Sequence, residues 1–252
     1  MCKALLSSCY PNFLIPSYQF TVEYFLKNDL EPVAYLVYMV VLFLQFNQRK
    51  AIRHWVLSVY SLFAAVSIYV GIILTENEYK KLVPQNSIWH FLTEQNNWTY
   101  SLVYIINACV FSWLFYTLLR GKIRRIIIIA CCLVNVIFFI YTDIISNLFL
   151  SAFNSAVYGL TFLTIILYTL LYLYELLTNI KEENLLEDFD FWLICGYLLY
   201  YLGSFVIVIY YQNADPPERG SIWSMNNIIL FICSLILLVA YFKIPKNKKI
   251  MV

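Results

Sequence analysis

The chain has 252 residues, of which 62% are hydrophobic and only 13% charged, and its mean hydropathy is +0.72. A soluble domain is about half apolar and a quarter charged, and no compact fold of this length hides so much apolar surface from water, so the composition excludes a soluble protein. The net charge of +2 comes from basic residues in short clusters between apolar runs, which excludes a nucleic-acid-binding face.

Seven apolar segments are long enough, or nearly so, to cross the hydrocarbon core of a bilayer, which takes about 20 residues. In chain order they are Pro32–Asn47 (the shortest), Trp55–Leu74, Trp98–Leu119, Ile123–Thr142, Ala156–Leu177, Phe191–Tyr211 and Trp223–Phe242. Backbone groups in lipid must pair within their own segment, and the runs show none of the alternation of a β-barrel. We therefore predict an all-α membrane protein, a seven-transmembrane helix bundle in a lipid bilayer.

The basic residues predict the orientation of this bundle. Twelve of the 17 lysines and arginines lie in the first, third and fifth connections and the C-terminal tail, although the fifth connection holds only Lys181. Cytoplasmic loops carry an excess of Lys and Arg, so the N-terminus is predicted outside and the C-terminus in the cytoplasm. Residues 1–31 are then an extracytoplasmic tail, 32–243 the bundle and 244–252 a basic cytoplasmic tail. Residues 87–95, in the long second connection, are predicted to form a short surface helix.

Polar residues inside the spans are the candidates for a binding site, because they are costly there and often functional. Tyr100, Tyr104 and Asn107 follow one face of the third span, and Tyr201 lies deep in the sixth. Asn226 and Asn227 lie one turn inside the seventh. These six residues are either a ligand cavity open to the outside or a set of interhelical hydrogen bonds, each worth under about 1–2 kcal/mol.

Glu175 lies near the predicted cytoplasmic end of the fifth span. It has two interpretations. The carboxylate pairs with an arginine of a neighbouring loop, or it acts as a proton-coupled switch.

Motifs of catalysis and metal binding are absent from the sequence. The two histidines, His54 and His90, are predicted on opposite sides of the membrane, and there is no H-E-x-x-H, G-x-S-x-G or C-x-x-C. Gly203-Ser204 lies mid-span with no histidine near enough to activate the serine, which fits a helix crossing. Every lysine lies in a loop or at a helix end, which excludes a retinal Schiff base. We expect no enzymatic activity, no metal and no cofactor.

The last two spans carry a family resemblance. FWLICGYLLYYLGSF and IWSMNNIILFICSLILLVAYF resemble the seven-helix membrane proteins of Bacteroidota that occur alone or fused to histidine kinases. The matching positions are Phe191, Trp192, Gly196, Leu199, Tyr200 or Tyr201, Gly203, Ser204, Trp223, Asn226 and Asn227. The resemblance implies a sensory membrane module with its output inside the cell. Since the sequence ends soon after the last span, the signal is expected to pass to a separate protein.

These observations favour a receptor-like sensor in a bacterial inner membrane. A small or lipophilic ligand is expected between the outer ends of the third, sixth and seventh spans, and a separate partner such as a histidine kinase is expected to receive the signal. A small-molecule transporter or channel is the first alternative, and it predicts a helix broken near mid-membrane. A structural subunit of a membrane complex is the second. It predicts that the polar stripes face lipid, whereas a receptor predicts that they converge on one cavity.

Overall fold

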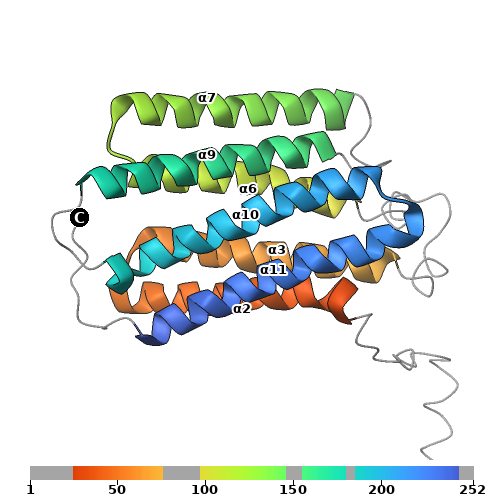
Figure 1. Cartoon of the computed structure of the whole chain (residues 1–252), viewed down its shortest axis with the longest axis horizontal. Coiled ribbons are helices and arrows are strands. Elements are labelled where there is room, and N and C mark those ends of the chain that lie inside the picture. Colours follow the sequence, from red (N-terminus) through yellow and green to blue (C-terminus); the bar gives the residue numbers. More distant parts are fainter. Residues whose placement is uncertain (1–24, 76–96, 146–154, 180–184, 244–252) are drawn as a thin grey trace, which may run out of the picture.

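The computed structural model describes residues 25–75, 97–145, 155–179 and 185–243 (Figure 1). The N-terminal tail before residue 25, the surface helix predicted at 87–95 and the basic tail at 244–252 lie outside the described residues. Within the described ranges the chain is all-α, and seven helices are long and apolar enough to cross a membrane. The prediction of seven apolar spans is therefore confirmed.

Each predicted span corresponds to one long helix. The helices are α2 (Leu30–Arg49), α3 (Ile52–Thr75), α6 (Asn97–Leu118), α7 (Lys122–Phe139), α9 (Ser155–Asn179), α10 (Phe189–Asn213) and α11 (Pro216–Lys243). Three short helical segments flank them, namely η1 (Phe25–Asp29), η2 (Ile140–Ile145) and η3 (Leu185–Glu187). The first and last helices begin before the predicted spans, at Leu30 and Pro216. Glu31 is therefore part of α2 and not of the tail before it.

Short connections set neighbouring helices antiparallel. Between α2 and α3, Lys50 adopts a left-handed conformation with φ of 55° and donates its backbone N–H to the Phe46 carbonyl at 2.7 Å. This connection lies at the same end of the bundle as the α6–α7 connection and the end of α11, on the left of Figure 1. We call it the basic end, after its arginines and lysines, and the opposite end, where α2 begins, the Glu31 end.

Six of the seven helices form a closed ring. Each packs against the next in the order α2, α3, α6, α9, α10, α11, and α11 packs back against α2. Helix α7 lies outside this ring, against α6 and α9 (Figure 1). In its membrane-length stretch only 17% of the residues are buried, against 44–50% in the other six helices. The isoleucine-rich outer face of α7 is suited to contact with lipid.

The inside of the ring is aromatic and tightly packed. Its largest fully buried side chains include Tyr158, Tyr168, Phe111, Phe115 and Phe162. In lipid there is little hydrophobic force between helices, so close packing and hydrogen bonds hold them together. One close contact between helices lies at the Glu31 end, where Gly71 of α3 packs against Thr99 of α6. A methyl group added at Gly71 would be only 2.6 Å from Thr99 Oγ1.

Candidate functional site

The predicted ligand residues of α6 and α10 lie in the ring interior. The Tyr201 hydroxyl donates to Asn107 Oδ1 at 2.9 Å and thereby joins α10 to α6. The Tyr104 ring packs on Tyr158 of α9, with ring centroids 4.1 Å apart, and also on Phe162. Both sets of contacts bind one helix to another, as interhelical packing predicts.

The two asparagines of α11 are buried but point to different partners. The Ser204 hydroxyl of α10 donates to Asn226 Oδ1 at 2.6 Å. Asn227 Nδ2 donates to the Leu26 carbonyl at 3.2 Å, which ties α11 to η1. The six predicted residues are therefore buried in several local contacts, and of the six only Tyr201 lines the cavity described next.

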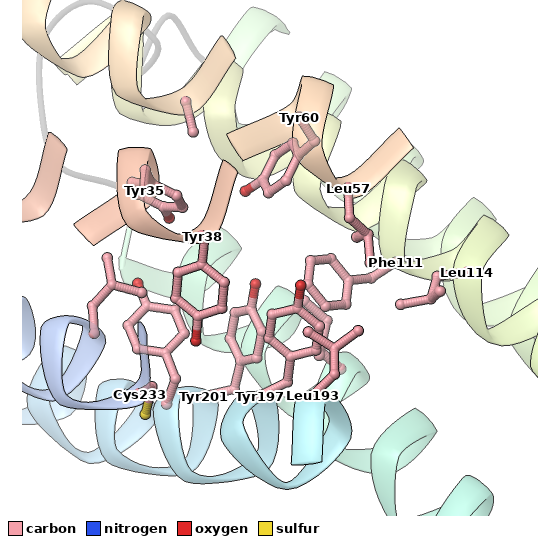
Figure 2. Packing of buried hydrophobic residues seen from close by; sticks show 14 of the residues in the cluster. Tyr35, Tyr38, Leu57, Tyr60, Phe111, Leu114, Leu193, Tyr197, Tyr201 and Cys233 are labelled. Atoms are coloured by element: carbon pink, nitrogen blue, oxygen red, sulfur yellow. The ribbon is translucent and has the colours of Figure 1, made fainter. Parts of the chain in front are cut away.

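A small cavity lies between α2, α3, α6, α10 and α11. Six tyrosines line it: Tyr35, Tyr38, Tyr60, Tyr197, Tyr200 and Tyr201. Ser61 and Phe111 complete much of the remaining wall. Figure 2 shows the hydroxyls of Tyr60, Tyr197 and Tyr201 turned into the space between the helices. The cavity has a volume of about 10 Å³, which is room for about one water molecule.

The polarity of this cavity comes from phenol groups in the middle of an apolar bundle. Tyr38 is 2% exposed, and its ring stacks on Tyr197 with an interplanar angle of 8°. Among the described residues, the Tyr38 hydroxyl has no hydrogen-bond partner. A buried hydroxyl without a partner is costly, so this group is suited to bind a water or a polar ligand atom.

Sequence reasoning missed the contribution of α2 and α3 to the cavity. Glu31, Tyr35 and Tyr38 are spaced i, i+4 and i+7, which places them on one helical face. The same spacing argument that selected the stripe on the third span applies to this stripe. It was hidden because the predicted span began at Pro32, after Glu31.

Glu31 is the buried carboxylate of the Glu31 end. It is 2% exposed, and its Oε2 accepts the Trp223 indole N–H at 3.3 Å and the Tyr100 hydroxyl at 3.5 Å. The Tyr100 ring meets the Trp223 ring edge to face, with centroids 5.5 Å apart, and Tyr211 contacts the same indole. This group joins α2, α6, α10 and α11 around one carboxyl group.

At the basic end, a buried ionic triad joins α3 to α10. Asp190 Oδ1 lies 2.8 Å from His54 Nε2, and its other oxygen accepts the Arg53 guanidinium. His54 is fully buried, with its ring edge against Phe189. Asp188 caps α10 by accepting the Asp190 backbone N–H at 3.1 Å.

This triad was also missed by sequence reasoning, since its members precede the second and sixth predicted spans. A His–Asp pair is a common base and orienting group in enzymes. Among the described residues, however, His54 Nδ1 has no hydrogen-bond partner, so no nucleophile is held against the ring. What the triad does in this structure is to neutralise charge and link two helices.

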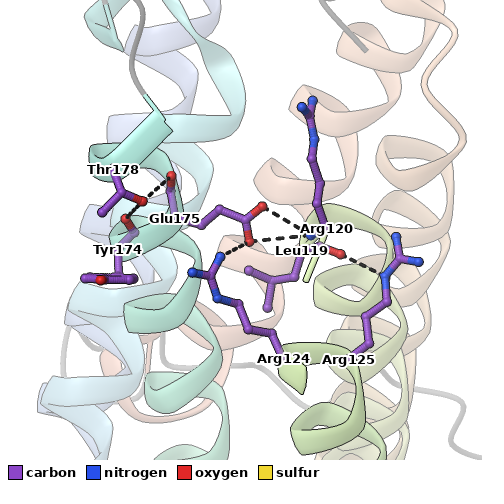
Figure 3. Close-up of polar contacts among 7 residues, drawn as sticks. All are labelled: Leu119, Arg120, Arg124, Arg125, Tyr174, Glu175 and Thr178. Atoms are coloured by element: carbon purple, nitrogen blue, oxygen red, sulfur yellow. Dashed lines mark hydrogen bonds and ion pairs between the residues drawn. The ribbon is translucent and has the colours of Figure 1, made fainter. Parts of the chain in front are cut away.

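Glu175 holds the α6–α7 connection (Figure 3). Its carboxylate accepts a hydrogen bond from the Arg124 guanidinium. The Arg120 backbone N–H also donates to it, at 3.2 Å to Oε1 and 3.4 Å to Oε2. The Arg125 guanidinium donates to the Leu119 carbonyl at 2.8 Å in the same turn. Glu175 thus has the loop-arginine partner that one of its two interpretations requires.

Comparisons with protein-family models, with curated proteins and with solved structures found no match. The resemblance of the last two spans to the Bacteroidota proteins therefore stays a hypothesis. Within the described ranges, no group of three or more His, Cys, Asp or Glu residues is arranged to hold a metal ion. The seven apolar helices make the protein a multi-span membrane protein in contact with the lipid bilayer.

Proposed function

We propose that the protein is a receptor-like sensor of a bacterial inner membrane. The Glu31 end faces outward, as the distribution of basic residues predicts, and a small or lipophilic ligand binds there. The basic end relays the event to a separate partner such as a histidine kinase. The sequence resemblance of the last two spans supports the same function.

One observation carries this proposal: polar and aromatic groups continue inside the ring from the Glu31 end to the middle of the bundle. Glu31 contacts Tyr100 and Trp223, and Tyr35, one turn further along α2, lines the central cavity. A structural subunit was expected to turn its polar stripes toward lipid. Here Tyr104, Asn107, Tyr201 and the α11 asparagines are buried, which argues against stripes that face lipid, but of these residues only Tyr201 lines the cavity that a receptor requires.

The helices that hold Glu31 and Trp223 also reach the basic end. Helix α2 carries Glu31 at one end and Gln48 at the other, where the Gln48 amide donates to the Tyr241 hydroxyl of α11. The short connection after α2 leads directly to Arg53 and His54 of the triad. A displacement of α2 against α11 by a ligand would therefore move groups on the basic face.

The continuity of the helices favours a receptor over a transporter. Transporters often bind substrate where a spanning helix is broken near mid-membrane. Helices α2, α10 and α11, which line the cavity, run as α-helices without a break over their described lengths. An alternating-access site of that kind has no counterpart along them.

The test uses the full chain in lipid nanodiscs and a library of polar, amphiphilic and lipophilic compounds. We expect a compound to slow hydrogen exchange at the start of α6 and α11 and to change exchange in the connections 49–52 and 119–122. Tyr201→Phe removes the hydroxyl that binds Asn107 and should weaken the response. Tyr69→Phe, at an exposed position on α3, is the matched control. Binding without any change at the basic end contradicts a sensor, and uptake of the compound into liposomes indicates a transporter.

A further inference from the structure

The charge at the Glu31 end is unbalanced within the described part of the protein. Asp190 is paired with Arg53 and Glu175 with Arg124. Among the side chains that the structure describes, no lysine, arginine or histidine forms an ion pair with Glu31. A carboxylate buried in a low-dielectric interior must be neutralised by a cation or by a proton.

The two groups that contact Glu31 do not supply that neutralisation. Both the Trp223 indole and the Tyr100 hydroxyl are uncharged, and their donor–acceptor distances of 3.3 and 3.5 Å are longer than ordinary hydrogen bonds. A stronger donor placed between the carboxylate and these rings would gain more than either of them does. The position next to Glu31 is therefore suited to a positively charged group.

The surroundings of Glu31 are those in which proteins bind organic cations. An ammonium group is attracted by the faces of Trp and Tyr rings, and a buried carboxylate adds a full opposite charge. Trp223 and Tyr100 contact the carboxylate, and Tyr211 packs on Trp223 and has the Arg219 guanidinium 5.7 Å from its ring centroid. Tyr35, one turn along α2, leads to the tyrosine-lined cavity. The Tyr38 hydroxyl, which has no partner among the described residues, lines that cavity.

We infer that Glu31 is the anionic anchor of a site for a small organic cation, a protonated or quaternary amine that carries an apolar group. This inference rests on the proposed function and names the ligand class of its site. A divalent metal ion fits poorly, because Mg²⁺ and Ca²⁺ require about six or more oxygen ligands and Glu31 is the only carboxylate among the described contacts. The tyrosine-lined cavity holds about one water and is lined by neither Trp223 nor Tyr100, so binding requires these two side chains to move apart while their rings still face the amine.

The test compares cations with neutral molecules of the same shape. The full chain in a mild detergent is titrated with choline and benzyltrimethylammonium, and with their uncharged counterparts 3,3-dimethylbutan-1-ol and neopentylbenzene, each up to ~10 mM. Binding is measured by calorimetry and by the rise in unfolding temperature. We expect at least one cation to bind about tenfold or more tightly than its neutral counterpart.

Variants assign the effect to Glu31. Glu31→Gln keeps the size and the acceptor oxygen but removes the charge, and it should weaken cation binding by about tenfold or more. Glu218→Gln removes an exposed carboxylate from the same end of the bundle and should leave binding unchanged. Trp223→Phe keeps an aromatic face and should retain more affinity than Trp223→Leu. Arg219→Gln removes a guanidinium that lies 5.7 Å from the centroid of the Tyr211 ring, an internal competitor for the site, and should not weaken binding.

Several results would overturn the inference. They are binding of neither cation, equal binding of cation and neutral counterpart, and a Glu31→Gln protein that is folded and binds the cation like the wild type. The proposed function fails separately. If the cation binds at Glu31 but hydrogen exchange at the basic end does not change, the cation site stands and the sensor function falls. If only uncharged compounds alter the basic end, the sensor function stands and the cation site falls.

Discussion

The two ends of the bundle treat buried carboxylates in opposite ways. At the basic end, Asp190 contacts Arg53 and His54, and Glu175 contacts Arg124. At the other end, Glu31 receives only the N–H of an indole and a distant phenol. The paired carboxylates link helices, and they are explained by structure alone. Glu31 has no cation partner among the described side chains, and its two weak contacts do not account for a buried carboxyl group. The binding site is proposed there for that reason.

The largest effect is expected from Asp190→Asn, which tests the structural role of the basic end. The change leaves the Arg53 guanidinium, 24% exposed, without its counter-charge in a buried position. Breaking a buried pair costs about 3–5 kcal/mol, and we expect the lower part of that range because Arg53 is partly solvated. The free energy of unfolding, measured by SDS titration in mixed micelles, checks this.

Asp215→Asn, at an exposed residue between α10 and α11, is the control for Asp190→Asn and should change the free energy of unfolding by less than about 0.5 kcal/mol. A loss below about 1 kcal/mol for Asp190→Asn would show that the triad is not a structural link. The contrast between the two ends would then disappear.

Gly71→Ala tests whether the Glu31 end is loosely built in general. The added methyl group would lie 2.6 Å from Thr99 Oγ1 and 2.8 Å from its Cγ2, and Thr99 is fully buried. Overpacking of this kind costs about 1–3 kcal/mol. At Gly159, also at this end, the nearest atom would be 3.8 Å away, so Gly159→Ala should be neutral or stabilise the helix by up to about 1 kcal/mol.

Thermal unfolding of the two alanine variants in one detergent separates them. Equal stability would mean that α3 and α6 are not in close contact at Gly71. The weak contacts of Glu31 would then be a property of the whole end and not of one site.

The spans were predictable because length and apolarity are local properties of a sequence. Their ends were less so. Proline is tolerated in the first turn of a helix, so Pro32 did not mark the start of α2 and Pro216 lies at the start of α11. The ring order, with α7 outside it, depends on packing between distant segments and has no local signature.

The site was only partly predictable for the same reason. The stripe on the third span placed Tyr104 and Asn107 in the interior, where the structure has them. It did not predict that Asn107 binds Tyr201, which is 94 residues away in sequence. Arg53 and Asp190 are 137 residues apart and each resembled a loop residue beside a span. A charged residue at a span boundary becomes informative only when the opposite charge on the neighbouring helix is known.

A smaller effect is expected within the basic end itself, from Glu175 and Arg124. The Arg124 side chain is 27% exposed, so solvent screens the pair and its coupling should be about 0.5–1.5 kcal/mol. A double-mutant cycle of Glu175→Gln and Arg124→Gln, read by unfolding in mixed micelles, measures this coupling. Arg125→Gln is the matched control, because that guanidinium donates to a backbone carbonyl and not to Glu175. A coupling near zero would leave Asp190 as the only structural ion pair of the three carboxylates.

The smallest change in stability is expected from Glu31→Gln. Whether this variant is more or less stable than the wild type is the sharpest test of the difference between the two ends. Glutamine keeps an oxygen for the Trp223 N–H and removes a charge that no described cation balances. The ligand-free protein should therefore be unchanged or more stable by up to about 1 kcal/mol, measured as for Asp190→Asn. A loss above about 2 kcal/mol would mean that Glu31 holds a structural cation as Asp190 does. Because the same substitution should weaken amine binding by about tenfold or more, stability and affinity should move independently at Glu31.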